Sequence, residues 1–208
     1  MKISSSDELE FWGKNLVNWQ NIWTKSPSVR TKDEVKLGKS LRARIDQNGI
    51  PNILRGELWP TLVSDSQEQL RGLEDRYRLL VKRPSTWQAE IASDISRTFP
   101  AHPKFVNNER GQMELFRVLK AYSIYDPELG YCQGTNFIVA TLLVQMPEER
   151  AFAVFVCFMY RFGLRAIYIN NFDGLTRLLF FIDELLKDGS SKLRKHLVSN
   201  DIGKDRSE

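Results

Sequence analysis

One segment near the middle of the 208-residue sequence places an acid and an arginine at a spacing that suits a hydrogen-bonded pair. Ile91, Asp94 and Arg97 recur at i, i+3 and i+6, along one face near the C-terminal end of an expected helix. The carboxylate of Asp94 can then hold the guanidinium of Arg97. From spacing alone, a surface ion pair of little energetic value is the plainer interpretation, and an oriented arginine is the other.

A second polar segment, Gly130-Tyr131-Cys132-Gln133-Gly134-Thr135-Asn136, comes directly before an apolar stretch. Glycines flank Gln133, so a tight turn can project its amide outward. Thr135 or Asn136 can cap the helix that follows. Viewed alone, this segment is most simply a capped turn.

The sequence carries no pattern typical of a metal site, a catalytic thiol or a nucleotide-binding loop. The two histidines, His102 and His196, and the two cysteines, Cys132 and Cys157, lack a zinc-binding spacing, so we expect no metal site. Cys132 beside His102 carries no signature of a nucleophile and its base. No glycine-rich phosphate loop is present, so we expect a chain with no nucleotide and no cofactor of its own.

Helical spacing dominates the elements that must position these segments. Apolar residues recur at three- and four-residue steps, and no strand pattern or internal repeat is found, which predicts an all-α fold. The expected helices lie at about 9–23, 32–47, 70–81, 87–99, 113–125, 135–146, 148–162 and 175–186. Residues 49–60 are expected to form a compact turn-rich segment, and 188–208 a polar stretch that frays.

The first expected helix carries three of the five tryptophans. Its apolar side chains are Leu9, Trp12, Leu16, Trp19 and Trp23. Such a helix must dock onto something, and two interpretations are open. The helix packs on its own domain, or it occupies the groove of an additional partner.

Composition narrows the class of protein further. The chain is 42% apolar with a net charge of +4, and residues 51–186 are nearly neutral, with 15 basic against 16 acidic residues. No basic stripe is present, so we expect no nucleic-acid partner. Pro147-Glu148-Glu149-Arg150 divides the most apolar stretch into pieces of about ten to twelve residues, too short to span a bilayer. Two cysteines and no visible leader predict a cytoplasmic chain in a reducing compartment.

Taken in order, the segments resemble the TBC-domain family of Rab GTPase-activating proteins over residues 49–200. The motifs that carry the resemblance are Gly49-Ile50-Pro51-x-x-x-Arg55-Gly56-x-x-Trp59, Ile91-x-x-Asp94-x-x-Arg97-Thr98-Phe99-Pro100, Tyr122-Ser123 and Gly130-Tyr131-Cys132-Gln133-Gly134-x-Asn136. The resemblance implies that Arg97 and Gln133 enter the nucleotide site of a GTP-bound Rab, which carries the GTP and Mg²⁺. An always-charged guanidinium suits the charge that develops on a transferring phosphoryl group, and a glutamine amide can orient the attacking water.

The resemblance also implies supporting roles. Asp94 would orient the arginine, Tyr131 and Gly134 would shape the glutamine turn, and Ile91 and Asn136 would support the two motifs. Five further residues would brace the fold: Gly49, Pro51, Arg55, Gly56 and Trp59.

The implied organisation is an irregular multi-helix TBC-type domain at 49–200, after an N-terminal helical extension at 1–48 and before a polar tail at 201–208. Family members continue into further helices, so we expect the N-terminal catalytic half and an incomplete C-terminal half. The first expected function is activation of Rab GTPases in vesicle-traffic regulation, at endomembranes through the GTPase partner. The alternative is a catalytically impaired, truncated module that binds a GTPase or another partner.

Overall fold

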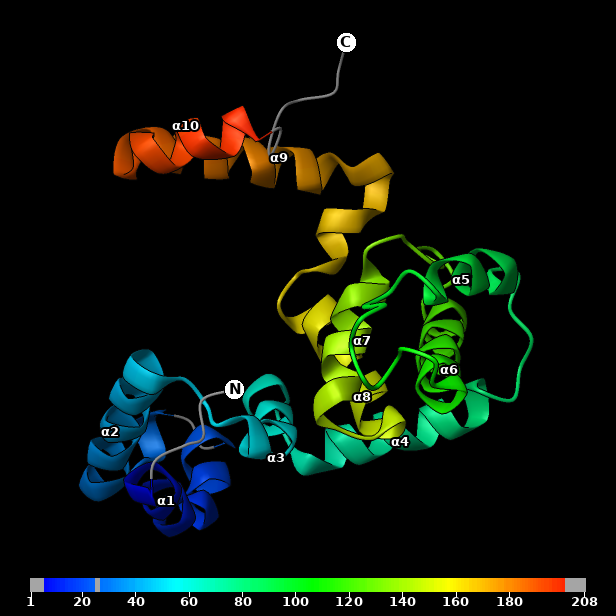
Figure 1. Cartoon of the computed structure of the whole chain (residues 1–208). Helices are drawn as coiled ribbons and strands as arrows, with labels where there is room; N and C mark the ends of the chain where they lie inside the picture. The colour runs from blue at the N-terminus through cyan, green and yellow to red at the C-terminus, as the bar shows by residue number, and fades with distance from the viewer. Residues whose placement is uncertain (1–5, 25–26, 201–208) are drawn as a thin grey trace. The chain divides into compact units, whose positions relative to one another are not determined.

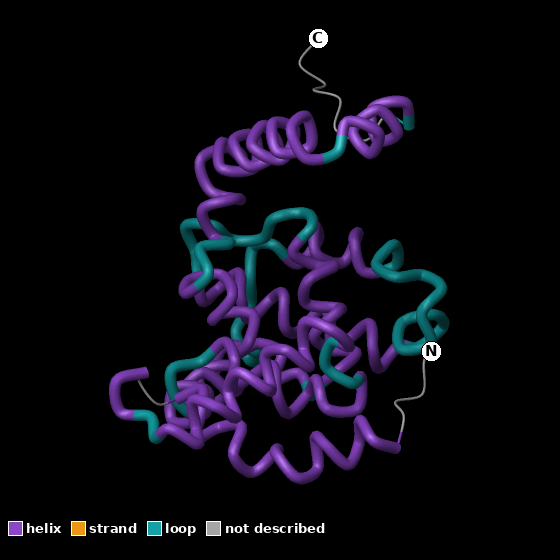
Figure 2. The backbone as a smooth tube through the Cα atoms, turned by 90° about the vertical axis from the view of Figure 1, so that its left-hand side faces the viewer, coloured by secondary structure: helices purple, strands orange, loops and turns teal. Residues whose placement is uncertain are grey.

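The computed structural model describes residues 6–24 and 27–200. All regular secondary structure in these ranges is helical (Figures 1 and 2). The expected all-α class is therefore confirmed. The elements are α1 (Ser6–Thr24), the short η1 (Pro27–Val29), α2 (Lys32–Asn48), α3 (Asn52–Val63), α4 (Gln67–Leu80), α5 (Gln88–Ile95), α6 (Glu109–Tyr125), α7 (Thr135–Gln145), α8 (Glu148–Arg161), α9 (Arg165–Gly189) and α10 (Ser191–Ser199).

The chain divides into two compact units, residues 1–161 and residues 162–208. In the first unit, α6, α7 and α8 lie side by side, and α4 packs along α8 (Figure 1). Residues 151–157 of α8 are all buried, as expected for a helix without a polar face. The rings of Tyr77 and Tyr122 reach this helix, with centroids 5.3 Å from Phe152 and 4.6 Å from Phe155 respectively.

The N-terminal helix packs inside the same unit. Trp12 is 1% exposed and shares a cluster with Ile22, Leu41, Ile50 and Leu58. Its indole N–H donates to the buried Glu8 carboxylate (2.9 Å), which also accepts from Asn48 Nδ2 (3.1 Å). For Trp12, docking on the chain's own domain is therefore observed. The other apolar side chains expected to dock lie outside the described ones: Leu9, Leu16, Trp19 and Trp23.

Two expectations about local structure were wrong. Residues 52–63 form the helix α3, not a turn-rich segment, with Pro51 at its N-cap and Pro60 in its last turn. Pro51 precedes the first turn, where proline costs little, and burial of Leu58 and Val63 in the core compensates for the helical hydrogen bond that Pro60 cannot donate.

The second wrong expectation concerned the C-terminal stretch. Residues 191–199 form α10, which does not fray away from α9. Arg194 makes two hydrogen bonds to the carboxylate of Asp183 on α9, at 2.7 and 3.2 Å. This paired contact orders a sequence whose own pattern is mostly polar. Residues 201–208, the expected polar tail, lie outside the described ones.

In the second unit, α9 extends over 25 residues, well beyond the apolar stripe expected at 175–186. Several of its apolar side chains are exposed: Leu178, Leu179, Phe180, Phe181, Ile182 and Leu185. In the described part of the chain, no helix has both the length and the apolar character needed to cross a membrane.

Candidate functional site

The arginine segment lies at the end of α5. Ile91 is fully buried in the core of the first unit, and Asp94 is only 3% exposed. Arg97 follows two residues after the helix ends, with 59% of its side chain exposed, and its Nη2 donates to Asp94 Oδ1. Because the carboxylate is buried while the guanidinium reaches solvent, this contact is not a surface ion pair. A buried carboxylate therefore accepts a hydrogen bond from an exposed arginine.

The second oxygen of Asp94 joins this segment to the glutamine segment. Tyr131 Oη donates to Asp94 Oδ2 over 2.6 Å, across 37 residues of sequence. Burial raises the pKa of Tyr131, and so do the hydrogen bond to Asp94 and the negative charge of the Asp94 carboxylate. The phenol therefore stays protonated and acts as a donor. Two segments that sequence reasoning treated separately share one buried carboxylate.

The glutamine segment turns on glycines. Gly130 and Gly134 have φ angles of 64° and 101°, in the left-handed range where a side chain is strained. Gln133 is exposed, and its amide makes no hydrogen bond to the described residues. The turn therefore presents the carboxamide to solvent, as the sequence predicted.

The expected helix cap was wrong. Gly134 itself is the N-cap of α7, and no side chain caps the helix. The hydroxyl of Thr135 donates backwards to the Cys132 carbonyl (2.6 Å), and Asn136 Oδ1 accepts from the Gly134 N–H (2.9 Å). Because both residues already have helical positions, their side chains stabilise the turn before the helix.

Sequence reasoning assigned no role to several residues that support the site. Thr98 Oγ1 donates to the Asp94 carbonyl and accepts from Asn136 Nδ2, each over 2.7 Å. Asp126, also buried, accepts from Tyr122 Oη (3.1 Å) and from the Leu129 N–H (3.3 Å), and so holds the start of the glutamine loop. The bond between Asn136 and Thr98 could not be predicted from spacing, because the two residues are 38 positions apart in the sequence.

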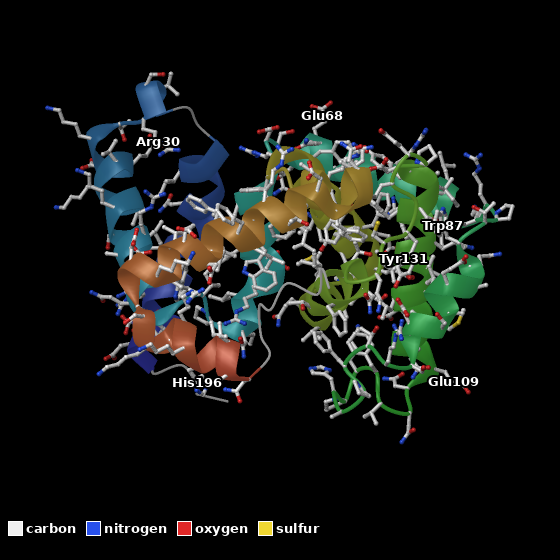
Figure 3. The ribbon with its side chains drawn as sticks, turned by 90° about the horizontal axis from the view of Figure 1, so that it is seen from above. Arg30, Glu68, Trp87, Glu109, Tyr131 and His196 are labelled. Atoms are coloured by element: carbon white, nitrogen blue, oxygen red, sulfur yellow. The ribbon has the colours of Figure 1, made fainter. Side chains whose placement is uncertain are left out.

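Trp87 also supports the glutamine loop. A Cβ added to Gly130 would lie 2.4 Å from the indole of Trp87, so the ring covers this glycine closely. The backbone N–H of Trp87 donates to Ser85 Oγ (3.1 Å), which lies 2.7 Å from Ser123 Oγ on α6. In Figure 3, Trp87 and Tyr131 lie near each other beside α5. The connection before α5 is thus tied both to α6 and to the glutamine loop.

The five residues expected to brace the fold lie on α3 and at its start. Gly49 ends α2 with a φ of 71°, and Pro51 is the N-cap of α3. Arg55 Nε donates to the Ile50 carbonyl (3.0 Å), and its guanidinium lies 5.7 Å from the Trp59 ring centroid. A Cβ on Gly56 would lie 2.3 Å from the carbonyl oxygen of Gln145, so only glycine allows α3 to approach the end of α7.

The two loops present an exposed guanidinium and an exposed carboxamide and are joined beneath them by buried hydrogen bonds. A cavity of about 420 Å³ between α3, α4 and the α7–α8 connection is lined in part by Gly56 and Gln145, and neither Arg97 nor Gln133 lines it. Both polar groups are therefore accessible to a partner molecule.

Comparison with known proteins identifies the family. The family model for the Rab-GTPase-TBC domain (RabGAP-TBC) matches residues 52–205, so the chain belongs to this family. It is 36% identical over 194 residues to the Rab GTPase-activating protein tbc-11 of Caenorhabditis elegans and 33% identical over 191 residues to human TBC1 domain family member 1. These matches cover 92% and 88% of this chain but 19% and 16% of the relatives, so the chain spans less than a fifth of their length.

Solved structures agree with this assignment. The Chlamydomonas flagellar RabGAP TBC domain superposes with a TM-score of 0.62 at 26% identity, covering 97% of this chain and 67% of that one. The Ypt/Rab-GAP domain of Gyp1p superposes with a TM-score of 0.58 at 20% identity and shows the same fold, covering 91% of this chain and 69% of that one.

Proposed function

We propose that this chain accelerates GTP hydrolysis by a Rab-type GTPase, and that Arg97 and Gln133 enter the nucleotide site of the GTP-bound partner. One observation carries the proposal. Both side chains are exposed on loops that share the buried Asp94–Tyr131 hydrogen bond, in a chain of the Rab-GTPase-TBC family. A Rab partner would bring this activity to endomembranes, where it would regulate vesicle traffic.

The two side chains have complementary tasks in this reaction. The partner carries GTP and Mg²⁺, and negative charge spreads over the transferring phosphoryl group in the transition state. The guanidinium of Arg97 would stabilise that charge, and Asp94 would keep its planar donor group directed outward. The amide of Gln133 can accept from and donate to the attacking water, and so align it for in-line attack.

The test is single-turnover GTP hydrolysis over a panel of purified Rab proteins. Arginine fingers as a class contribute about 10³–10⁵ in rate, or roughly 4–7 kcal/mol of barrier. We expect Arg97→Ala and Gln133→Ala each to remove most of the acceleration. Arg97→Lys keeps the charge but loses the planar fork, so it should restore little.

Arg110→Ala is the matched control. Arg110 is 88% exposed on α6 and, like Arg97, contacts one acid, Glu114, at 3.2 Å. Its loss should leave the hydrolysis rate unchanged. Acceleration that survives Arg97→Ala, or that falls equally with Arg110→Ala, would contradict the proposed role of Arg97.

A further inference from the structure

We infer that Thr98 and Asn136 are a positioning pair that locks the arginine loop to the glutamine loop, so that the two fingers are presented as one rigid unit. This inference rests on the proposed function. It adds a residue, Thr98, to which neither the sequence motifs nor the chemistry of hydrolysis assigns a task. Thr98 directly follows Arg97, and Asn136 holds the residue that directly follows Gln133.

The hydrogen bonds form a continuous path between the loops. Thr98 Oγ1 donates to the Asp94 carbonyl (2.7 Å) and accepts from Asn136 Nδ2 (2.7 Å). The other end of the Asn136 amide, Oδ1, accepts from the Gly134 N–H (2.9 Å). Thr98 and Asn136 are each 1% exposed, so water does not compete for these bonds. Displacement of either loop would leave buried polar groups without partners, which is costly.

The next residue on each side makes a second contact between the same two segments. The rings of Phe99 and Phe137 meet edge to face, with centroids 5.6 Å apart. Phe99 has a φ of 46°, a left-handed conformation that residues other than glycine adopt only when their surroundings hold them there. Two consecutive residues of the arginine loop therefore contact two consecutive residues of α7. This is a defined register rather than an isolated contact.

The type of side chain at position 98 follows from the geometry. A hydroxyl can donate to one group and accept from another at the same time, whereas valine, of nearly equal shape, can do neither. Because the Asp94–Tyr131 bond remains in a Thr98→Val chain, we expect the fold and partner binding to persist. The loops should lose their fixed relation. A misplacement of about 1 Å at a reacting group can cost 10²-fold in rate.

The activity test compares Thr98→Val with Thr98→Ser on a Rab that the wild-type chain activates. We expect Thr98→Val to lower kcat by about 10- to 100-fold with KM within about threefold, and Thr98→Ser to restore most of kcat. Thr61→Val is the matched control, because the Thr61 hydroxyl is buried in α3 without a hydrogen-bond partner among the described residues. This variant should keep full activity.

Two further measurements separate positioning from general destabilisation. In a Gln133→Ala background, Thr98→Val should cost several-fold less than in the wild type, because the loop it aligns no longer carries a finger. The Gly134 amide should exchange with deuterium at least tenfold faster in Thr98→Val, because Asn136 loses its anchor, and amides of α8 should be unchanged.

The inference is overturned if Thr98→Val behaves like Thr61→Val in activity and leaves the Gly134 amide protected. It is also overturned if Thr98→Val costs the same with and without Gln133. A wild-type chain that activates no Rab would contradict the proposed function instead. The exchange at Gly134 would still test the link between the loops.

Discussion

The hydroxyl of Tyr131 offers a direct test of the buried link between the two loops. Tyr131→Phe keeps the ring and its packing and removes only the group that donates to Asp94 Oδ2 over 2.6 Å. Asp94 would keep its contact with Arg97 but lose a donor to its second oxygen. Because this carboxylate is 3% exposed, water cannot readily replace the lost hydrogen bond.

The size of the effect follows from the charge on the acceptor. Hydrogen bonds to charged groups contribute about 1.5–3 kcal/mol, so we expect Tyr131→Phe to lower the free energy of unfolding by about 2 kcal/mol. With a urea m-value of roughly 1–3 kcal/mol/M, the midpoint of unfolding should fall by about 1 M.

Urea unfolding followed by circular dichroism measures this shift, with Tyr125→Phe as the control. Tyr125 is a half-buried tyrosine of α6 whose hydroxyl makes no hydrogen bond to the described residues. Its loss should cost less than about 0.5 kcal/mol, as for substitutions away from such contacts. The reasoning is refuted if the two variants unfold at the same urea concentration. It is also refuted if Tyr131→Phe costs as much in an Asp94→Ala chain as in the wild type.

Three other predictions concern single residues of the first unit. Gly130→Ala should destabilise the chain by about 1–3 kcal/mol and lower activity, because a Cβ would lie 2.4 Å from the Trp87 indole at a φ of 64°. Gly163→Ala is the control, because Gly163 has a φ of 71° and a Cβ there would meet nothing within 4 Å, so only backbone strain is added. If the two variants lower the thermal unfolding temperature equally, contact with Trp87 plays no part. Burial raises the pKa of Cys157 from 9.0 to about 11, so the folded state keeps a proton that the unfolded chain loses above pH 9. Stability should therefore decline from pH 9 to about 11, by on the order of 1–2 kcal/mol, and a Cys157→Ala chain with the same decline would contradict this. Asp94→Ala should lower GTP hydrolysis less than Arg97→Ala, since in the proposed reaction Asp94 acts only by positioning, through its bonds to Arg97 and Tyr131; an equal loss in a folded chain would count against that role.

Much of this fold could be predicted from the sequence because helix signals are local. The three- and four-residue spacing of apolar side chains located α4, two almost wholly apolar runs located the core helices α7 and α8, and no alternating strand pattern was present. The same local logic placed Asp94 beside Arg97 and put Gln133 on a glycine-flanked turn, since these relations span only a few residues.

Helix α3 and the start of α7 show where local signals failed. Two prolines and Gly56 predicted a turn, yet packing of Leu58 and Val63 and the close approach to Gln145 stabilise a helix. At α7, Thr135 and Asn136 are good capping residues by type, but the chain enters the helix through Gly134, whose φ of 101° favours glycine.

The partners of the buried polar groups were decided only by the tertiary structure. Tyr131 reaches Asp94 across 37 residues, Asn136 reaches Thr98 across 38, and Trp87 covers Gly130. A hydroxyl or an amide has no periodic signature, and its energy depends on which group the folded chain brings within about 3 Å. The sequence by itself therefore determined which residues are presented and on which elements. The tertiary structure determined that a single buried set of hydrogen bonds holds both loops. The packing of α5 against α6, and of the loop after α5 against the start of α7, removes those groups from water and leaves them to pair with one another.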